Sequence, residues 1–433
     1  MPHLIDLIPT IGLSLLAFII AVLIIVTIHE LGHYLVGRWR GIGADVFSIG
    51  FGPELISMTD RRGTRWRLAA IPFGGYVRFR GDASPASAPS GTRAQGTFEA
   101  ASLWSRTLTI IAGPAANFVF AILVIAGYFL WSGIPSEEAR VGALRPHPVP
   151  SELRAGDLVL TVGGRSVESQ LALMELSSVL PPGQVLTWEV EREGKTVSVM
   201  APRPMSPLVE RVGPLTPAYR AGLLAGDVIL ERDGATLTDF SDLRSYVLAS
   251  EGIEMSLLVW RDGQTREIRV SPELTDQPSI GGGFESRWVL GLSAGLPYEH
   301  AMRQPSLQEA LWIGADRTWR VIHLTGSALS NIVTGAISHC NIRGVISMGE
   351  ASGATAAQGA GTFVMFLALL SVTIGFMNLL PIPTLDGGHL ALYAWEAVRG
   401  HAPSPRVTSA MMTVGMGLLI FMMVLGLIND LTC

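Results

Sequence analysis

The sequence predicts a polytopic α-helical membrane protein with four transmembrane helices and two inserted α+β domains. Of its 433 residues, 48% are hydrophobic and only 15% are charged, and the mean hydropathy is +0.40. This composition is typical of an integral membrane protein that also carries extramembrane domains. The net charge of −5 argues against nucleic acid as a partner. The two cysteines, Cys340 and Cys433, cannot form a disulfide framework and do not have the spacing of metal ligands.

Four apolar stretches of the sequence are long enough to cross a bilayer, whose hydrocarbon core is about 30 Å thick. The loop between the first two stretches, residues 37–106, carries ten arginines against five acidic residues. Because basic residues favour the cytoplasmic side, we expect this loop to be cytoplasmic and the long insert after the second stretch to lie outside, in a bacterium in the periplasm. The predicted transmembrane segments are 1–36, 107–131, 362–392 (a broken segment) and 408–428.

The first apolar stretch ends with the sequence His29-Glu30-Leu31-Gly32-His33. On a helix, positions i and i+4 face the same side, so His29 and His33 can bind one zinc ion while Glu30 lies beside it to activate a water. An ionisable group within a hydrocarbon core costs about 2.5–3.5 kcal/mol on insertion scales and is therefore a functional candidate. Within the first segment the apolar run starts at Ile11, so His29 lies about 18 residues into it, roughly 27 Å along, which places the motif toward the cytoplasmic side. The alternative is a pair of helix-end histidines that face an interface.

The third apolar stretch supplies a candidate for the third zinc ligand. Pro381 and Pro383 stop the helix and free backbone groups. Asp386 follows in an apolar setting without a nearby basic residue in sequence, so its carboxylate needs a cation, and zinc would serve. His389 is the alternative ligand, although we favour a hydrogen-bonding role for it. Asn378 either ends the helix or bonds to backbone, of this protein or of a bound substrate.

The second apolar stretch contains a proline and an amide three residues apart, Pro114 and Asn117, after Gly113. Small residues and a polar group on one helix are common at helix–helix contacts in membranes. We therefore expect this segment to pack against the helices that carry the site. A direct role in the site is the alternative.

The loop 37–106 contains two short, apolar, glycine-rich segments, residues 47–53 and 71–77. Neither can span a membrane, but together they could form a re-entrant β-hairpin that lines a cavity or is buried in protein. Residues 305–338 form an amphipathic pattern typical of a helix on the bilayer surface. The small residues of 351–361 predict a linker.

The insert contains an internal repeat, because Ala-Gly-Asp-Leu-Val-Leu at 155–160 recurs as Ala-Gly-Asp-Val-Ile-Leu at 225–230. Alternating β-branched strands and glycine turns at this period predict two similar small domains, 134–204 and 205–295. The turn and strand after a short helix resemble the PDZ domain, which binds extended chain ends by adding a strand to a sheet edge. Two β-rich spacers without a ligand are the alternative.

Three spaced motifs resemble the site-2 protease family of intramembrane zinc metalloproteases. The insert and the four-span layout resemble the bacterial RseP (regulator of sigma-E protease) branch of that family, and the resemblance covers essentially the whole chain. One departure is Arg343-Gly344-Val345, where the family usually has a Gly-Pro segment. The motifs are His29-Glu30-x-x-His33, Gly113-Pro114-x-x-Asn117 and Asn378-x-x-Pro381-x-Pro383-x-Leu385-Asp386-Gly387.

The resemblance implies a zinc ion held by His29, His33 and Asp386, with Glu30 as the catalytic acid and base. It also implies a single-span transmembrane substrate already trimmed on its periplasmic side by an upstream protease. An anti-sigma factor or a remnant signal peptide would be such a substrate, in the bacterial inner membrane. The residues that the resemblance implies in substrate binding are Gly50, Phe51, Gly52, Asn378 and Pro381.

Two other classes of function remain open for the sequence. A non-catalytic membrane scaffold could use the PDZ-like pair to bind chain ends, but it would not need Glu30 or Asp386. A transporter could use a broken helix and charges inside the membrane, but four spans without a second inverted half fit that class poorly.

Overall fold

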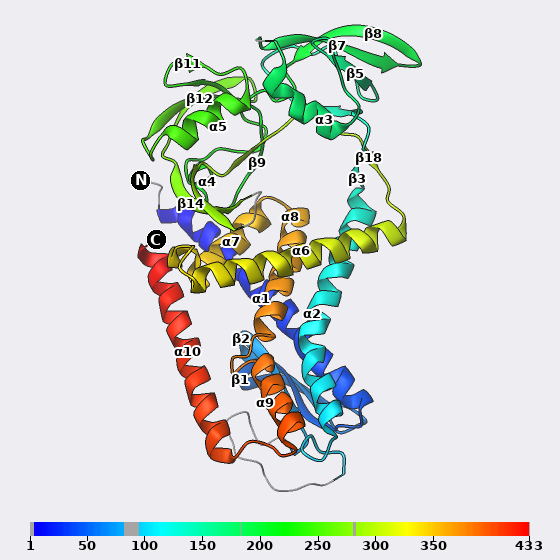
Figure 1. Cartoon of the computed structure of the whole chain (residues 1–433), viewed down its shortest axis with the longest axis vertical. Coiled ribbons are helices and arrows are strands. Elements are labelled where there is room, and N and C mark those ends of the chain that lie inside the picture. Colours follow the sequence, from blue (N-terminus) through cyan, green and yellow to red (C-terminus); the bar gives the residue numbers. More distant parts are fainter. Residues whose placement is uncertain (1–3, 82–94, 182, 280–282, 433) are drawn as a thin grey trace. The chain divides into compact units, whose positions relative to one another are not determined.

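The computed structural model describes residues 4–81, 95–181, 183–279 and 283–432 (Figure 1). The chain forms two compact units. The helical unit comprises Met1–Tyr128 and Leu307–Cys433, and the sheet-rich unit comprises the intervening residues Phe129–Ser306.

The described part of the helical unit contains four helices that are long and apolar enough to cross a membrane. Each overlaps one of the four apolar stretches of the sequence. The last of them exposes Ile420, Phe421 and Val424 by 53%, 60% and 50%. Apolar surface of this kind is costly in water and fits a helix that faces lipid. The four helices are α1 (Leu4–Trp39), α2 (Leu103–Ser132), α8 (Ala360–Asn378) and α10 (Pro405–Thr432).

Helix α6 (Leu307–Val333) follows the sheet-rich unit and is amphipathic. Its buried residues include Gly314, where a Cβ would lie 2.6 Å from the carbonyl oxygen of Ile122 in α2. Trp312 and Trp319, seven residues apart, are 73% and 64% exposed. One face of α6 therefore packs within the helical unit, and another presents large aromatic side chains.

Residues 345–357 form helix α7 (Val345–Ala357), so the linker predicted for 351–361 is wrong. Small residues at this position form a helix contact: a Cβ on Gly353 would lie 2.7 Å from the Cα of Ser14 in α1. In membranes, small side chains let helix backbones approach closely. The composition that suggested a linker therefore marks a packed helix.

The segment Arg343-Gly344-Val345 and the start of α7 donate backbone hydrogen bonds to a single carboxylate. The N–H of Gly344 donates to Asp430 Oδ1 at 2.8 Å, and the N–H groups of Ile346 and Ser347 donate to Asp430 Oδ2. A proline at 344 would lack that donor. Asp430, near the end of α10, thus caps the start of α7.

Just before this segment, in the 3₁₀ turn η2 (His339–Asn341), Cys340 is disulfide-bonded.

Between α1 and α2, strands β1 (Ala44–Thr59) and β2 (Arg65–Phe79) pair in an antiparallel arrangement. Both strands bend, so that residues 44–49 pair with 75–79 on one side and with 65–68 on the other, while 54–59 pair with 65–69. Gly50 and Gly52 lie at the bend of β1 with φ of +87° and +82°, a region that glycine adopts readily. The segments 75–79 and 54–59 are consequently the two edges of this sheet.

The sheet-rich unit contains two four-stranded antiparallel sheets with the same strand order, β6-β5-β7-β8 and β11-β10-β12-β13. Each sheet covers its own hydrophobic core. The strands of the first sheet are β5 (Leu158–Val162), β6 (Arg165–Ser166), β7 (Val185–Arg192) and β8 (Lys195–Pro202). Those of the second are β10 (Val228–Arg232), β11 (Ala235–Thr236), β12 (Met255–Arg261) and β13 (Gln264–Val270). The helices are α3 (Gln170–Glu175), η1 (Leu176–Val179), α4 (Pro217–Arg220) and α5 (Phe240–Ala249).

The first repeat is completed by strands that follow the second repeat in sequence. Strand β4 (Val141–Leu144) pairs with β17 (Tyr298–His300), and Tyr298 is buried in the first core. A contiguous domain ending at residue 204 would leave out this strand. The remaining pairs are β3 (Ile134–Pro135) with β18 (Met302–Arg303), β9 (Val209–Val212) with β16 (Leu292–Ala294), and β14 (Glu273–Pro278) with β15 (Phe284–Val289).

The repeated aspartate of the two Ala-Gly-Asp sequences forms the same buried ion pair in each half. Asp157 accepts from Arg192 at 2.7 and 2.8 Å, and Asp227 accepts from Arg261 at 2.6 and 2.7 Å. Burial raises the pKa of a carboxyl group, but hydrogen bonds from Arg192 and the N–H of Arg154 outweigh it and lower the pKa of Asp157. This stabilisation is therefore present at neutral pH and is lost as the pH falls through the lowered native pKa.

We predict that Arg192→Met destabilises the first repeat by about 3–5 kcal/mol, because it leaves a buried carboxylate without its partner. The matched control is Arg269→Met, since Arg269 is 71% exposed and lies 3.8 Å from Glu267. Hydrogen exchange in the full chain measures each effect in its own repeat, over residues 134–203 for Arg192→Met and over residues 205–279 for Arg269→Met. An equal loss of protection in the two variants would contradict the prediction.

Candidate metal centre

Three side chains from α1 and from helix α9 (Asp386–Arg399) converge on one point. Asp386 Oδ2 lies 3.1 Å from His29 Nε2 and 3.4 Å from His33 Nε2, and the two Nε2 atoms are 3.1 Å apart. Both histidines are buried, with 8% and 6% exposed. The structure therefore brings together the three ligands expected from the sequence, and the group does not include the alternative ligand His389.

Asp386 reaches the histidines because the chain turns sharply between α8 and α9. Helix α8 ends at Asn378, and α9 starts with Asp386 in its first turn. A Cβ on Gly387 would overlap the carbonyl oxygens of Leu379 and Leu380, so only glycine permits this turn. The helix break predicted from Pro381 and Pro383 thus places the carboxylate of Asp386 beside the histidines of α1.

The donor set of this point fits a zinc ion. Zinc binds histidine nitrogen and carboxylate oxygen, and a catalytic site keeps three protein ligands and one open position. Asp386 Oδ2 is buried and accepts no hydrogen bond from the residues that the structure describes, although it lies near both imidazoles. A buried carboxylate oxygen without a donor is costly and would be satisfied by a cation.

Helix α2 holds the imidazole of His33 through its backbone. His33 Nδ1 lies 2.8 Å from the carbonyl oxygen of Thr109. A carbonyl can only accept, so Nδ1 carries the proton and the lone pair of Nε2 is free to face the shared point. The sequence offered no signal for Thr109, because its backbone rather than its side chain makes the contact.

The Gly113-Pro114-x-x-Asn117 motif of α2 contacts the candidate metal ligands His29 and His33 directly. A Cβ on Gly113 would lie 2.9 Å from His29 Nε2 and would overlap the imidazole of His33. The amide of Asn117 lies 3.3 Å from His29 Nδ1. Pro114 lies inside α2, where its carbonyl oxygen faces Gly375 of α8. The packing expected for this segment is thus accompanied by contacts to the site itself.

Glu30 lies one residue beyond His29 and is held by the hairpin. Its Oε2 accepts a hydrogen bond from the backbone N–H of Val77 at 3.0 Å, and its side chain remains partly exposed. A Cβ on Gly75 would lie 3.2 Å from Val26 and 3.6 Å from Glu30 Cγ, so the edge segment 75–79 runs close to α1. Neither Val77 nor Gly75 was among the site residues expected from the sequence.

The residues expected to bind substrate lie at two bends of the helical unit. Phe51 is 42% exposed at the bend of β1 and stacks on Tyr76 with ring centroids 6.1 Å apart. Asn378 donates from Nδ2 to the carbonyl oxygen of Ile374 at 3.1 Å, so its amide is used within its own helix. Pro381 is exposed in the turn before α9.

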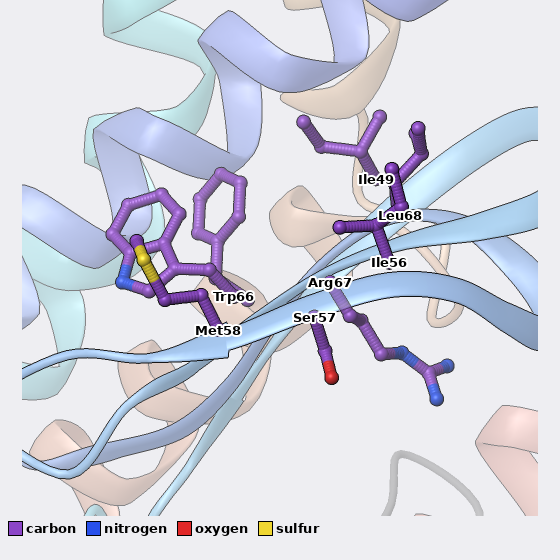
Figure 2. A pocket seen from close by; sticks show the side chains of 8 residues that line it. Ile49, Ile56, Ser57, Met58, Trp66, Arg67 and Leu68 are labelled. Carbon is purple, nitrogen blue, oxygen red and sulfur yellow. The ribbon is translucent and has the colours of Figure 1, made fainter.

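Figure 2 shows a pocket of about 250 Å³ on the same hairpin, which contains none of the metal ligands. Its apolar side chains lie together on one side of the strands, whereas Ser57 and Arg67 point to the other. The lining residues are Phe47, Ile49, Ile56, Ser57, Met58, Trp66, Arg67 and Leu68.

Comparison with known proteins agrees with this geometry. Residues 17–422 match the model of peptidase family M50. The chain is 34% identical over 445 residues to the regulator of sigma-E protease RseP of Salmonella typhimurium, and 33% identical to RseP of Escherichia coli. Each alignment covers 96% of this chain and 98% of the relative. A protein of Agrobacterium fabrum named as a zinc metalloprotease is 33% identical over 427 residues, which are 96% of this chain and 94% of that protein.

We predict that Gly113→Ala weakens zinc binding by about 5–150-fold, because relieving overlap in a packed interior costs about 1–3 kcal/mol and here displaces a candidate ligand. Gly127→Ala in the same helix is the control, since a Cβ there meets no atom within 4 Å. Chelator competition on the purified full chain measures both affinities. Wild-type affinity in Gly113→Ala would show that the imidazoles do not need this approach.

Proposed function

The chain belongs to peptidase family M50 and is a membrane zinc metalloprotease, and we propose that it hydrolyses a peptide bond within a single-span transmembrane substrate. The substrate would already be trimmed on its periplasmic side by an upstream protease, as an anti-sigma factor or a remnant signal peptide would be. Such cleavage serves regulated intramembrane proteolysis and envelope stress signalling. The observation that carries the proposal is the convergence of His29, His33 and Asp386 beside Glu30, on a helix apolar enough to span a membrane.

We place the protein in a bacterial inner membrane, with the metal centre toward the cytoplasmic side. The arginine excess of residues 37–106 supports this orientation. The sheet-rich unit would then lie in the periplasm, where two PDZ-like repeats could admit substrates that lack a bulky outer domain. The common strand order of its two sheets supports two repeats of the same fold.

The chemistry is proposed to be metal-assisted peptide hydrolysis. His29, His33 and Asp386 would hold zinc, which when bound supplies a Lewis acid for the scissile carbonyl and a water of lowered pKa. Glu30 would take the proton from the attacking water and later donate it to the nitrogen of the leaving amine. The N–H of Val77 would fix the position of that carboxylate.

A substrate helix must unwind before its carbonyl groups become accessible, because its backbone groups are paired with one another. An extended substrate could replace those hydrogen bonds by pairing with a sheet edge. Residues 46–49, just before Gly50, already have partners on both sides. We therefore propose that the substrate pairs with the sheet edge at Gly75, next to the N–H of Val77 that holds Glu30, and that Phe51 at the adjacent bend contacts its side chains.

Asn378 and Pro381 are proposed to act on the substrate indirectly. The amide of Asn378 closes the last turn of α8, and Pro381 lies in the turn that follows. Together they would shape the path that carries Asp386 to the histidines while leaving room for an extended chain.

We predict that Glu30→Gln lowers cleavage of a trimmed single-span substrate by about 10²–10⁴-fold, because the variant has no general base. Zinc content should stay at the wild-type level, since Glu30 is not a ligand. His29→Ala should lose zinc and cleavage together. The measurements are substrate cleavage in membranes and metal content of the purified chain.

Undiminished cleavage by Glu30→Gln would contradict the proposed function. It would leave the non-catalytic scaffold as the better description, in which the PDZ-like repeats bind chain ends and another protease acts. A scaffold of this kind would also still bind those chain ends when His29 is replaced by alanine.

We predict that Val77→Pro slows cleavage by about 10–100-fold, because a hydrogen bond to a charged group is worth about 1.5–3 kcal/mol. Proline is tolerated in an edge strand at positions whose N–H makes no hydrogen bond to the neighbouring strand. The N–H of Val77 is directed to Glu30 instead. Retained zinc would show that the metal centre is intact. A wild-type cleavage rate in this variant would contradict the assignment of this edge to the site.

A further inference from the structure

We propose that Asn117 is a positioning residue that accepts a hydrogen bond from His29 Nδ1 and so leaves His29 Nε2 free to bind zinc. The inference rests on the zinc site of the proposed function. It concerns the orientation of a ligand, not the reacting atoms.

Asn117 is fully buried and its side-chain amide faces His29. Its Nδ2 lies 3.3 Å from His29 Nδ1, and its Oδ1 has no hydrogen-bond partner within the described part of the chain. An unpaired buried amide oxygen is costly. If the side chain served only to fill space, a leucine of similar volume would avoid the cost of the unpaired oxygen. We therefore infer that the polar amide group is needed at this position.

The backbone around Asn117 is fixed by helix α8. The carbonyl oxygen of Asn117 accepts from Ser371 Oγ at 3.0 Å. A Cβ on Gly375 would lie 3.1 Å from the Cβ of Asn117 and 3.0 Å from Phe118, so the two helices are in close contact there. Asn117 is therefore held between α1 and α8, with its side-chain amide next to His29.

The chemistry of the ligand decides which amide atom must face it. A neutral imidazole carries one proton, and zinc needs the lone pair of Nε2, so the proton of His29 must be on Nδ1. That N–H requires an acceptor. If the amide donated to Nδ1 instead, the imidazole proton would be on Nε2 and would point at Asp386, which lies 3.1 Å away.

An asparagine can satisfy both states of the site. A rotation of its amide by 180° exchanges an oxygen and a nitrogen of nearly the same size, so that Oδ1 takes the place of Nδ2 beside His29. With zinc bound, His29 would donate to that oxygen. His33 already has this arrangement with the carbonyl oxygen of Thr109. The two acceptors lie eight residues apart on α2, about two helical turns.

The test compares two substitutions of Asn117 in the purified full chain. Asn117→Leu keeps the volume and removes the acceptor, whereas Asn117→Asp keeps an acceptor for an imidazole N–H. Groups that orient a metal-bound histidine typically change metal affinity by about 10–100-fold. We expect a loss of zinc affinity in that range for Asn117→Leu and an affinity within a few fold of wild type for Asn117→Asp, both by chelator competition.

Thermal unfolding shows whether each variant is folded, and Asn117→Ala replaces Asn117→Leu if the latter is not. Wild-type zinc affinity in a folded variant without the acceptor would overturn the inference. An equal loss in folded Asn117→Leu and Asn117→Asp would also overturn it, because packing would then explain both. A wild-type chain that binds no zinc would instead contradict the proposed function.

Discussion

The cost of placing ionisable groups inside an apolar helical bundle governs the organisation of the helical unit. Two imidazoles and two carboxylates lie where water is scarce, so each needs a partner of opposite character. His33 is hydrogen-bonded to the carbonyl oxygen of Thr109, and Glu30 accepts a hydrogen bond from the N–H of Val77. The proposed partner of Asp386 is the cation that it would bind together with the two histidines. The helices and the hairpin around the site are positioned so that these partners are within reach.

Close approach of backbones is the second requirement of this site, and glycine provides it. At Gly113 the absence of a side chain lets α2 contact the imidazoles, and at Gly375 it lets α8 contact α2. At Gly387 it lets the chain turn tightly enough to bring Asp386 back to α1. The close approach of the three candidate ligands His29, His33 and Asp386 therefore depends on glycines, which have no side-chain functional group.

In the proposed function, the bent β-sheet would hold the substrate next to the catalytic carboxylate. Its inner segment is paired on both sides, and one of its outer segments lies against Glu30. An edge at that place would offer backbone groups to an extended chain next to Glu30, the proposed general base. A membrane protease needs this combination, because an intact helix hides the bonds that it must cleave.

The sequence by itself determined the membrane class, and it predicted His29, His33 and Asp386 as the candidate metal ligands, because the length of apolar runs, the helical period and proline breaks are local properties. Only the tertiary structure decided which backbone groups hold the ligands, which sheet edge faces Glu30, and that Tyr298 completes the first repeat. Thr109 lies 76 residues from His33, and Val77 lies 47 residues from Glu30. Backbone donors and acceptors are the same in nearly every residue, so no sequence pattern marks the few that long-range folding brings to the site.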